Sequence, residues 1–168
     1  MGLDSGGLKF MLLKDEVEML KRVPIFARIA PAKLKLLAFT SDRVSYNAGQ
    51  ILFHQGDQGD AAYVVLSGTA DILVDSPAGQ IKVADVDINS IVGEIAILCD
   101  VSRTATVKAT SRLEALKISK EHFLKLLSDF PEMAVEIMRV LADRLNHTTS
   151  ELTAARSRQS QLQAVSTH

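Results

Sequence analysis

Glycines punctuate the middle of this 168-residue chain about every ten residues, and short runs rich in β-branched residues lie between them. The glycines are Gly49, Gly56, Gly59, Gly68, Gly79 and Gly93. Short strands with turn signals at this spacing are typical of an antiparallel sandwich, barrel or jelly roll. The sequence therefore predicts a mainly β fold with about seven or eight strands in residues 41–118. It also predicts tight hairpin turns at Ser67–Gly68 and Pro77–Gly79.

Helical patterns flank the β-rich part on both sides. Residues 1–40 carry apolar residues at helical spacing, interrupted by two prolines, and are predicted to form an N-terminal helical pair. The helical period returns in residues 119–163, where Pro131 separates a short hinge helix from a long one. The last residues, 164–168, are expected to form a disordered tail.

The long C-terminal helix carries mostly apolar residues at alternating spacings of four and three, which is the a/d pattern of a coiled coil. The positions are Ala134, Met138, Leu141, Leu145, Thr148, Leu152, Ala155, Gln159 and Leu162. A helix this long exceeds what a domain of this size needs for its own core. We therefore expect it to pair with the same helix of a second copy, forming a homodimer. The alternative is that it folds back onto the β-rich part.

Composition argues against several classes of function. The 19 basic and 20 acidic side chains give a net charge of -1, which does not favour a nucleic-acid surface. The single cysteine, Cys99, excludes an internal disulfide framework and a multi-cysteine metal site. No apolar run reaches the roughly 18 residues of a membrane span, and the N-terminus lacks a secretory pattern. We expect a cytoplasmic protein that makes no use of a membrane.

One segment late in the β-rich part is suited to binding an anion. Gly93 precedes a predicted helical turn whose first amides, those of Ile95 and Ala96, have no acceptor within the turn. Arg103 offers a planar guanidinium that matches two phosphate oxygens. A carboxylate does not favour the same anion, so Glu94 is expected to accept a hydrogen bond from a neutral donor such as a sugar hydroxyl. Phosphate and sugar together indicate a nucleotide.

This segment, residues 91–107, resembles the phosphate-binding cassette of the cyclic-nucleotide-binding domain family, which includes the regulatory subunits of protein kinase A and the bacterial catabolite activator. The matching positions are Gly93, Glu94, Ala96, Arg103, Thr104, Ala105, Thr106 and Val107. Val92 and Ser102 depart from the pattern, where the family has an aromatic residue and frequently a proline. The resemblance covers nearly all of the chain. It implies one domain, built as an antiparallel β-jelly roll, or double-stranded β-helix, with a C-terminal hinge helix and a long dimerisation helix.

The resemblance also implies a ligand, cAMP or cGMP, and a role for each matching residue. Glu94 would accept the ribose 2′-hydroxyl, and Arg103 would pair with the cyclic phosphate. The amides near Ile95 and Ala96 would complete the cradle, and Thr104 would add a hydroxyl. In the family, alanine at this last position accompanies a preference for cAMP in the kinase branch, whereas threonine occurs in relatives that bind cGMP.

The long helix supplies a further argument about the base. In the bacterial activator branch, an Arg-Leu pair precedes two hydroxyl residues that contact adenine, one of them from the partner subunit. Arg144, Leu145, Thr148 and Thr149 stand at the matching places. Thr148 is a polar residue on the seam, and the exocyclic amine of adenine would give it a partner. This favours cAMP and leaves cGMP as the alternative. The predicted ligand-binding residues are Gly93, Glu94, Ile95, Ala96, Arg103, Thr104, Ala105, Thr148 and Thr149.

The sequence thus predicts a non-enzymatic regulator in signal transduction, which binds a cyclic nucleotide without a metal and reorients its C-terminal helices. Its effector would be another protein, and DNA binding is not expected because no helix-turn-helix follows the long helix. A second hypothesis is a helical assembly module with a vestigial pocket. An enzyme, such as a phosphodiesterase, is less favoured because no cluster of metal ligands or paired acid and base accompanies the cassette. His54 resembles a metal ligand of the cupin jelly rolls, but Gly56 stands where a second histidine is needed.

Overall fold

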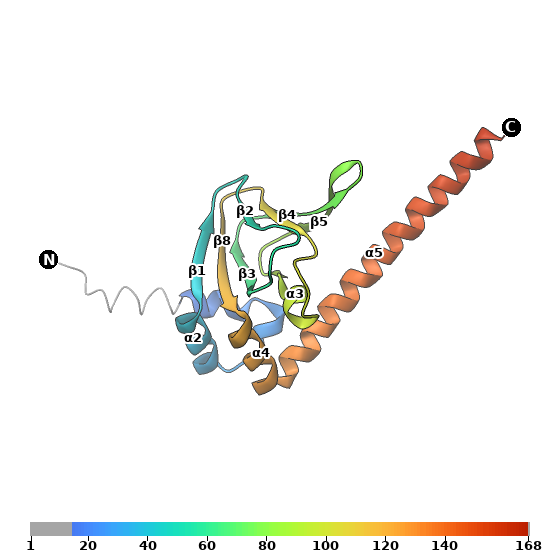
Figure 1. The fold of residues 1–168 in the computed structure, drawn as a ribbon. Helices are drawn as coiled ribbons and strands as arrows, with labels where there is room; N and C mark the ends of the chain where they lie inside the picture. Colours follow the sequence, from blue (N-terminus) through green and yellow to red (C-terminus); the bar gives the residue numbers. More distant parts are fainter. Residues whose placement is uncertain (1–14, 168) are drawn as a thin grey trace.

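The computed structural model describes residues 15–167, and within them two antiparallel sheets pack together with helices at one end (Figure 1). The strands are β1 (Asp42–Tyr46), β2 (Ile51–Phe53), β3 (Ala61–Ser67), β4 (Ala70–Ser76), β5 (Gly79–Val86), β6 (Ile91–Val92), β7 (Thr106–Ala109) and β8 (Leu113–Ser119). The helices are residues 15–21, the 3₁₀ helix η1 (Pro24–Phe26), α2 (Pro31–Thr40), α3 (Glu94–Leu98), α4 (Lys120–Asp129) and α5 (Pro131–Ser166). The prediction of a jelly roll with flanking helices is confirmed. The part of the predicted N-terminal helical pair in residues 1–14 lies outside the described residues.

The two sheets have the strand orders β1-β8-β3-β6 and β2-β7-β4-β5. Strand β3 explains how they pack, because its side chains alternate between two cores. Ala62 and Val64 face the helices, in a cluster that includes Phe123 of α4. Tyr63 and Val65 face the second sheet, in a cluster between the sheets. A central strand buried on both faces reads as a continuous apolar run, as this one does.

One of the two predicted hairpins is wrong. The turn at Pro77–Gly79 does join a hairpin, in which Ser76 pairs with Gly79. Ser67–Gly68 instead carries the chain from one sheet to the other, because β3 and β4 have no common ladder. Gly68 has a φ of +88°, and a Cβ there would lie 2.2 Å from the carbonyl oxygen of Arg112. The glycine therefore serves a close backbone crossing rather than a hairpin turn.

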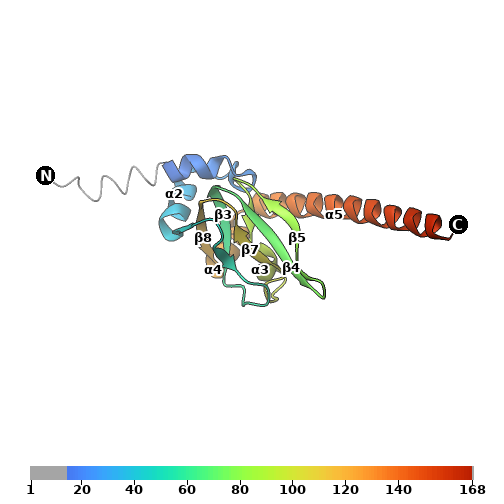
Figure 2. The same cartoon turned by 90° about the horizontal axis from the view of Figure 1, so that it is seen from above.

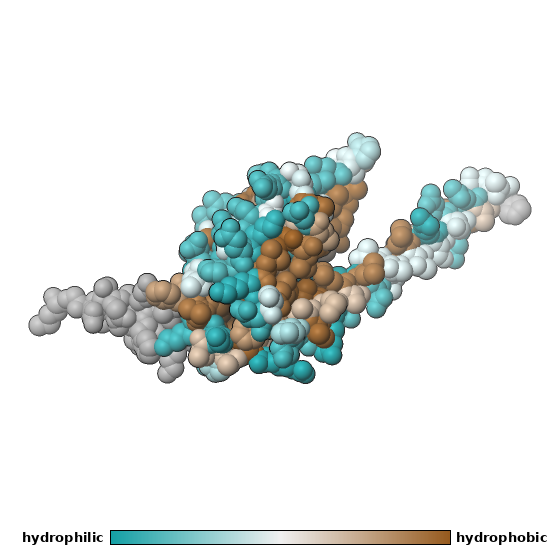
Figure 3. Space-filling view, turned by 60° about the horizontal axis from the view of Figure 1, so that its bottom comes forward, coloured by the Kyte–Doolittle hydropathy of each residue, from teal (hydrophilic) through white to brown (hydrophobic). Residues whose placement is uncertain are grey.

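Helix α5 begins against the body and then leaves it (Figures 1 and 2). Met133 and Ile137 are buried, whereas every residue from Leu145 to Thr167 is exposed, so the helix does not fold back onto the sandwich. In Figure 3 apolar side chains gather on the body beside the start of α5, and the far part of the helix is largely hydrophilic. No helix within residues 15–167 combines the length and apolar character needed to cross a bilayer.

The predicted tail at 164–168 is wrong for its first three residues, because α5 continues to Ser166. No proline or glycine follows Pro131, and the glutamines and alanines near the C-terminus are good helix formers. The sequence therefore has nothing that stops the helix at residue 163. His168 lies outside the described residues.

Candidate functional site

Gly93 connects β6 to the short helix α3 and fixes the geometry of the candidate site. Its φ of +84° lies in the left-handed region, which glycine adopts without steric cost. A Cβ at this position would lie 2.6 Å from Nη1 of Arg103 and 3.1 Å from the carbonyl oxygen of Ala61. Glycine is therefore required both by the turn and by the arginine packed against it.

Arg103 is almost completely buried, with 3% of its surface exposed. Its Nη1 donates to the carbonyl oxygen of Gly93 at 2.8 Å, and its Nη2 donates to that of Ala61 at 2.6 Å. The guanidinium carbon lies 4.1 Å from the ring centroid of Phe53, within cation–π range. Asp60 is 3.6 Å from Nη2. Burial lowers the pKa of this guanidinium, and nearby anionic groups oppose the shift.

The Nε–H of Arg103 is buried and has no hydrogen-bond partner within residues 15–167. A buried donor without an acceptor is unfavourable by about 1–3 kcal/mol. The sandwich therefore holds a fixed cation with hydrogen-bonding capacity to spare, which suits an anionic ligand.

Glu94, the first residue of α3, is 1% exposed. Arg144 of α5 reaches it, with Nη1 donating to Oε1 at 2.6 Å, while Nη2 donates to the carbonyl oxygen of Ile91 at 2.7 Å. Burial raises the pKa of the Glu94 carboxyl, and the charge of Arg144 counteracts this. The charged form of Glu94 thus needs a hydrogen-bond donor, and in this structure that donor is Arg144 of the long helix.

Both buried charges line one cavity of about 70 Å³. The predicted residues that line it are Gly93, Glu94, Ile95, Ala96, Arg103, Thr104 and Ala105. Thr148 and Thr149 do not line it, and both are exposed on α5. The volume matches about two water molecules, whereas small-molecule sites typically measure about 300–1,000 Å³. Arg144 is one of the walls.

Five residues of this cavity wall are not among the predicted ligand-binding residues: Phe53, Ile72, Val92, Val107 and Arg144. In the sequence analysis, Arg144 was used only to locate Thr148 and Thr149. The available signal was its position four residues before Thr148, on the same face of a helix predicted to reach the ligand, although Thr148 itself does not line the cavity. Phe53 and Ile72 come from strands whose alternation indicates inward-facing side chains but no particular neighbour.

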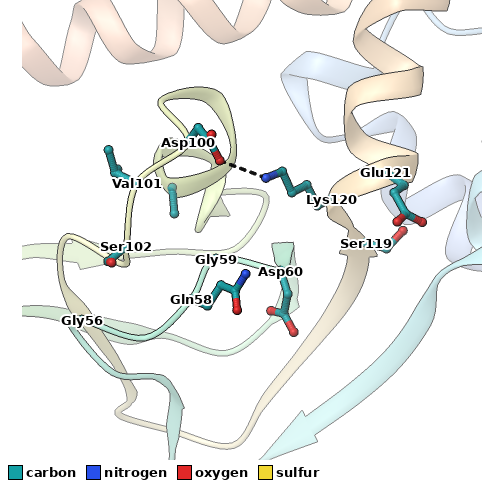
Figure 4. A pocket seen from close by; sticks show the side chains of 11 residues that line it. Gly56, Gln58, Gly59, Asp60, Asp100, Val101, Ser102, Ser119, Lys120 and Glu121 are labelled. Carbon is teal, nitrogen blue, oxygen red and sulfur yellow. Dashed lines mark hydrogen bonds and ion pairs between the residues drawn. The ribbon is translucent and has the colours of Figure 1, made fainter.

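A larger hollow, of about 900 Å³, lies between the loop at 56–60, the loop at 100–102 and the start of α4 (Figure 4). Its rim is polar, and Lys120 pairs with Asp100 across it at 3.2 Å. The charges on this rim are exposed, whereas Arg103 and Glu94 of the smaller cavity are buried. We place the candidate site in the smaller cavity, because buried charges need partners of opposite or hydrogen-bonding character. Residues 15–167 contain no group of three or more side chains placed to hold a metal ion.

Comparison with known proteins points to one family. A family model described as "Cyclic nucleotide-binding domain" matches residues 43–130. A lysophospholipase from Coccidioides immitis is 28% identical over 130 residues, which cover 77% of this chain and 8% of that protein. This chain therefore spans less than a tenth of that relative.

Solved structures share the fold. The catabolite activator protein from Thermus thermophilus has a TM-score of 0.68 at 30% identity, covering 77% of this chain and 61% of that one. The regulatory domain of Toxoplasma gondii PKA, crystallised with cAMP, has a TM-score of 0.72 at 19% identity, covering 81% of this chain and 52% of that one. The second likeness, at this identity, is one of fold.

Proposed function

This chain belongs to the cyclic nucleotide-binding domain family, and we propose that it is a non-enzymatic receptor that binds cAMP and reorients its C-terminal helices in response. The observation that carries the proposal is that one buried cation and one buried carboxylate, Arg103 and Glu94, meet at a single cavity. A cyclic nucleotide offers the complementary pair, an anionic phosphate and a neutral ribose hydroxyl.

In the proposed complex, Arg103 pairs with the cyclic phosphate, and its unpaired Nε–H supports this role. Glu94 accepts the ribose 2′-hydroxyl, which would replace Arg144 as its donor. The amides of Ile95 and Ala96 complete the phosphate cradle, since the first amides of a helix have no acceptor within it. Thr104 adds a hydroxyl from the cavity wall.

The size of the cavity supports a conformational response. A cavity of about 70 Å³ lies well below the range of about 300–1,000 Å³ that small-molecule sites occupy, so we expect a wall to move when a nucleotide binds. Arg144 is a wall carried by α5, and its contact with Glu94 competes with the ribose. We propose that the nucleotide displaces Arg144 and favours a different orientation of α5, to the extent that it binds the two orientations with different affinity.

We propose that α5 also forms a homodimer and carries the base contact. Its seam residues Leu145, Leu152 and Leu162 are 66%, 52% and 71% exposed. Pairing of two such helices would cover these leucines and bring Thr148 and Thr149 of one or both copies toward the base. The partner that adenine gives Thr148 favours cAMP over cGMP.

We place the receptor in the cytoplasm, where it would act on a protein effector in signal transduction. Its one cysteine, Cys99, is free and exposed, which suits a reducing compartment. The activity of any longer protein that contains this domain would lie in other segments, as the small coverage of the lysophospholipase suggests.

The proposal is tested by the thermal stability of the protein with nucleotides. At a hundredfold excess over its dissociation constant, cAMP should add about 2.7 kcal/mol and raise the melting temperature by roughly 5–11 °C. We expect a smaller rise at equal concentration with cGMP and none with AMP, which lacks the cyclic phosphate. No rise with either cyclic nucleotide contradicts the receptor function.

The second candidate function is a helical assembly module with a vestigial pocket, which the exposed seam of α5 favours. Replacement of Leu145 by aspartate should convert dimers to monomers in light scattering, because two carboxylates would meet on the seam. Asn146→Asp adds the same charge off the seam and should stay dimeric. Dimers that persist in Leu145→Asp contradict the seam assignment for both functions. Dimers without nucleotide binding leave only assembly.

A further inference from the structure

Another cavity, of about 370 Å³, lies beside the start of α5, between η1 and the loop that precedes β6. Its lining is largely apolar and includes Pro24, Ile88, Ile91 and Val140. Ile88 is 53% exposed although it is a large aliphatic side chain. The volume falls within the range of about 300–1,000 Å³ that small-molecule sites occupy.

Two cations line this apolar cavity, and none of the described residues that line it is acidic. Arg22 follows the helix at 15–21, and its guanidinium has no hydrogen-bond or ion-pair partner within residues 15–167. Arg144 gives one N–H to Glu94 and one to the carbonyl of Ile91, which leaves further donors of its five. Arg22 thus has no counter-charge among the described residues, and Arg144, although paired with Glu94, keeps free donors, so the two together favour an anion.

The wall opposite α5 is held by the sheet. Asn89 has a φ of +69°, in the left-handed region that asparagine tolerates better than most residues. Its N–H donates to the carbonyl of Val65 at 2.8 Å, and the N–H of Val65 donates to the carbonyl of Ser90 at 2.9 Å. The polar side chains of Asn89 and Ser90 therefore sit on a backbone fixed to the central strand β3, at the edge of the cavity.

We propose that this cavity binds a small organic anion with an apolar chain, of the medium-chain carboxylate class. The carboxylate lies between Arg22 and Arg144, and the chain lies against Pro24, Ile88 and Val140. The apolar lining distinguishes this ligand from inorganic phosphate or acetate, and the two cations distinguish it from a neutral lipid or an amine. The ligand would share Arg144 with the nucleotide cavity, which that residue also lines.

Calorimetric titration of the whole chain with octanoate, in the absence of nucleotide, tests this proposal. We expect one octanoate per chain, with acetate and octylammonium binding at least about tenfold more weakly. Arg22→Gln should weaken octanoate binding by about tenfold or more. Arg28→Gln removes an exposed arginine that does not line the cavity and should bind octanoate as the wild type does.

A second variant tests the apolar wall. Ile88→Asp places a carboxylate in the cavity at an exposed position, and should also weaken octanoate binding by about tenfold or more. Val83→Asp makes the same change at a residue of similar exposure, 50%, outside the cavity, and should leave binding unchanged. The proposal is overturned if octanoate does not bind, if octylammonium binds equally well, or if Arg22→Gln retains wild-type affinity. None of these results depends on whether cAMP binds.

Discussion

The two arginines that line the candidate site come from different regions of the molecule and are held in different ways. Arg103, from the sandwich, is buried and donates to two backbone carbonyls. Arg144, from α5, has a side chain that is 38% exposed and donates to one carbonyl and to the carboxylate of Glu94. A backbone carbonyl stays with the sheet, whereas a carboxylate can exchange one donor for another. Under the proposed function, the sandwich thus supplies a fixed binding group, and the helix supplies one that a ligand would replace.

The largest effect is expected from removing Arg103, the fixed binding group. Arg103→Ala should weaken cAMP binding by about 30-fold to several thousandfold, or about 2–5 kcal/mol, because the phosphate would enter a buried site without its counter-charge. Arg144→Gln should change the affinity by less than about tenfold, since the ribose hydroxyl takes over its hydrogen bond. Fluorescence titration with a labelled cAMP measures both.

Arg112→Ala is the matched control, because Arg112 is exposed and its side chain bonds only to Asn47 in the described residues. It should bind cAMP as the wild type does. If Arg103→Ala kept its affinity, or if Arg144→Gln lost more than Arg103→Ala, the division into a fixed and a replaceable arginine would be wrong.

The sequence predicted the sandwich more completely than the helix. The glycine-punctuated apolar runs of residues 41–118 and the register of Gly93, Glu94 and Arg103 are local patterns, which the sequence itself carries. The contact between Arg144 and Glu94 joins residues 50 positions apart. Its geometry depends on where α5 lies against the body, which no local pattern specifies.

The prediction of a hairpin at Ser67–Gly68 was wrong for a related reason. A serine and a glycine between two apolar runs fit a hairpin, and the same residues fit a passage from one sheet to the other. What distinguishes the two is the close approach of Gly68 to Arg112, a residue far along the chain. The base contacts of Thr148 and Thr149 stay a prediction, because a single chain leaves both threonines exposed.

A smaller effect concerns how the fixed arginine is kept in place. Gly93→Ala introduces a Cβ where Nη1 of Arg103 lies, in addition to the strain of a left-handed alanine. Gly49→Ala shares the strain, since Gly49 has a φ of +91°, but a Cβ there meets no atom of residues 15–167 within 4 Å. We expect Gly93→Ala to lower the free energy of unfolding by about 1–3 kcal/mol more than Gly49→Ala does.

Urea denaturation of the two variants gives this difference, and cAMP titration gives a second readout. Gly93→Ala should weaken cAMP binding by displacing Arg103, whereas Gly49→Ala should not. Equal losses of stability in the two variants, with cAMP binding intact in both, would mean that Arg103 accommodates the methyl group and is not rigidly held.

The smallest expected effect is on the pH dependence of stability, and it tests the contact between Glu94 and Arg144. Burial raises the pKa of Glu94 above its ordinary value of 4.5, so the folded state keeps this proton to a higher pH than the unfolded state does. The unfolded state therefore binds fewer protons in this range, and the contribution of Glu94 to stability falls as the pH rises from about 4.5 through the folded-state pKa. Glu94→Gln lacks this titration.

The free energy of unfolding of the wild type, minus that of Glu94→Gln, should accordingly decrease with rising pH and then level off. Urea denaturation at a series of pH values measures the difference. Arg144→Gln should make the decrease larger, because Arg144 is the group that holds the carboxylate in its charged form. A difference that increases with pH would mean that Arg144 stabilises the Glu94 carboxylate by more than burial opposes it. Arg144 would then be as firmly held as Arg103, and a ribose hydroxyl could not readily displace it.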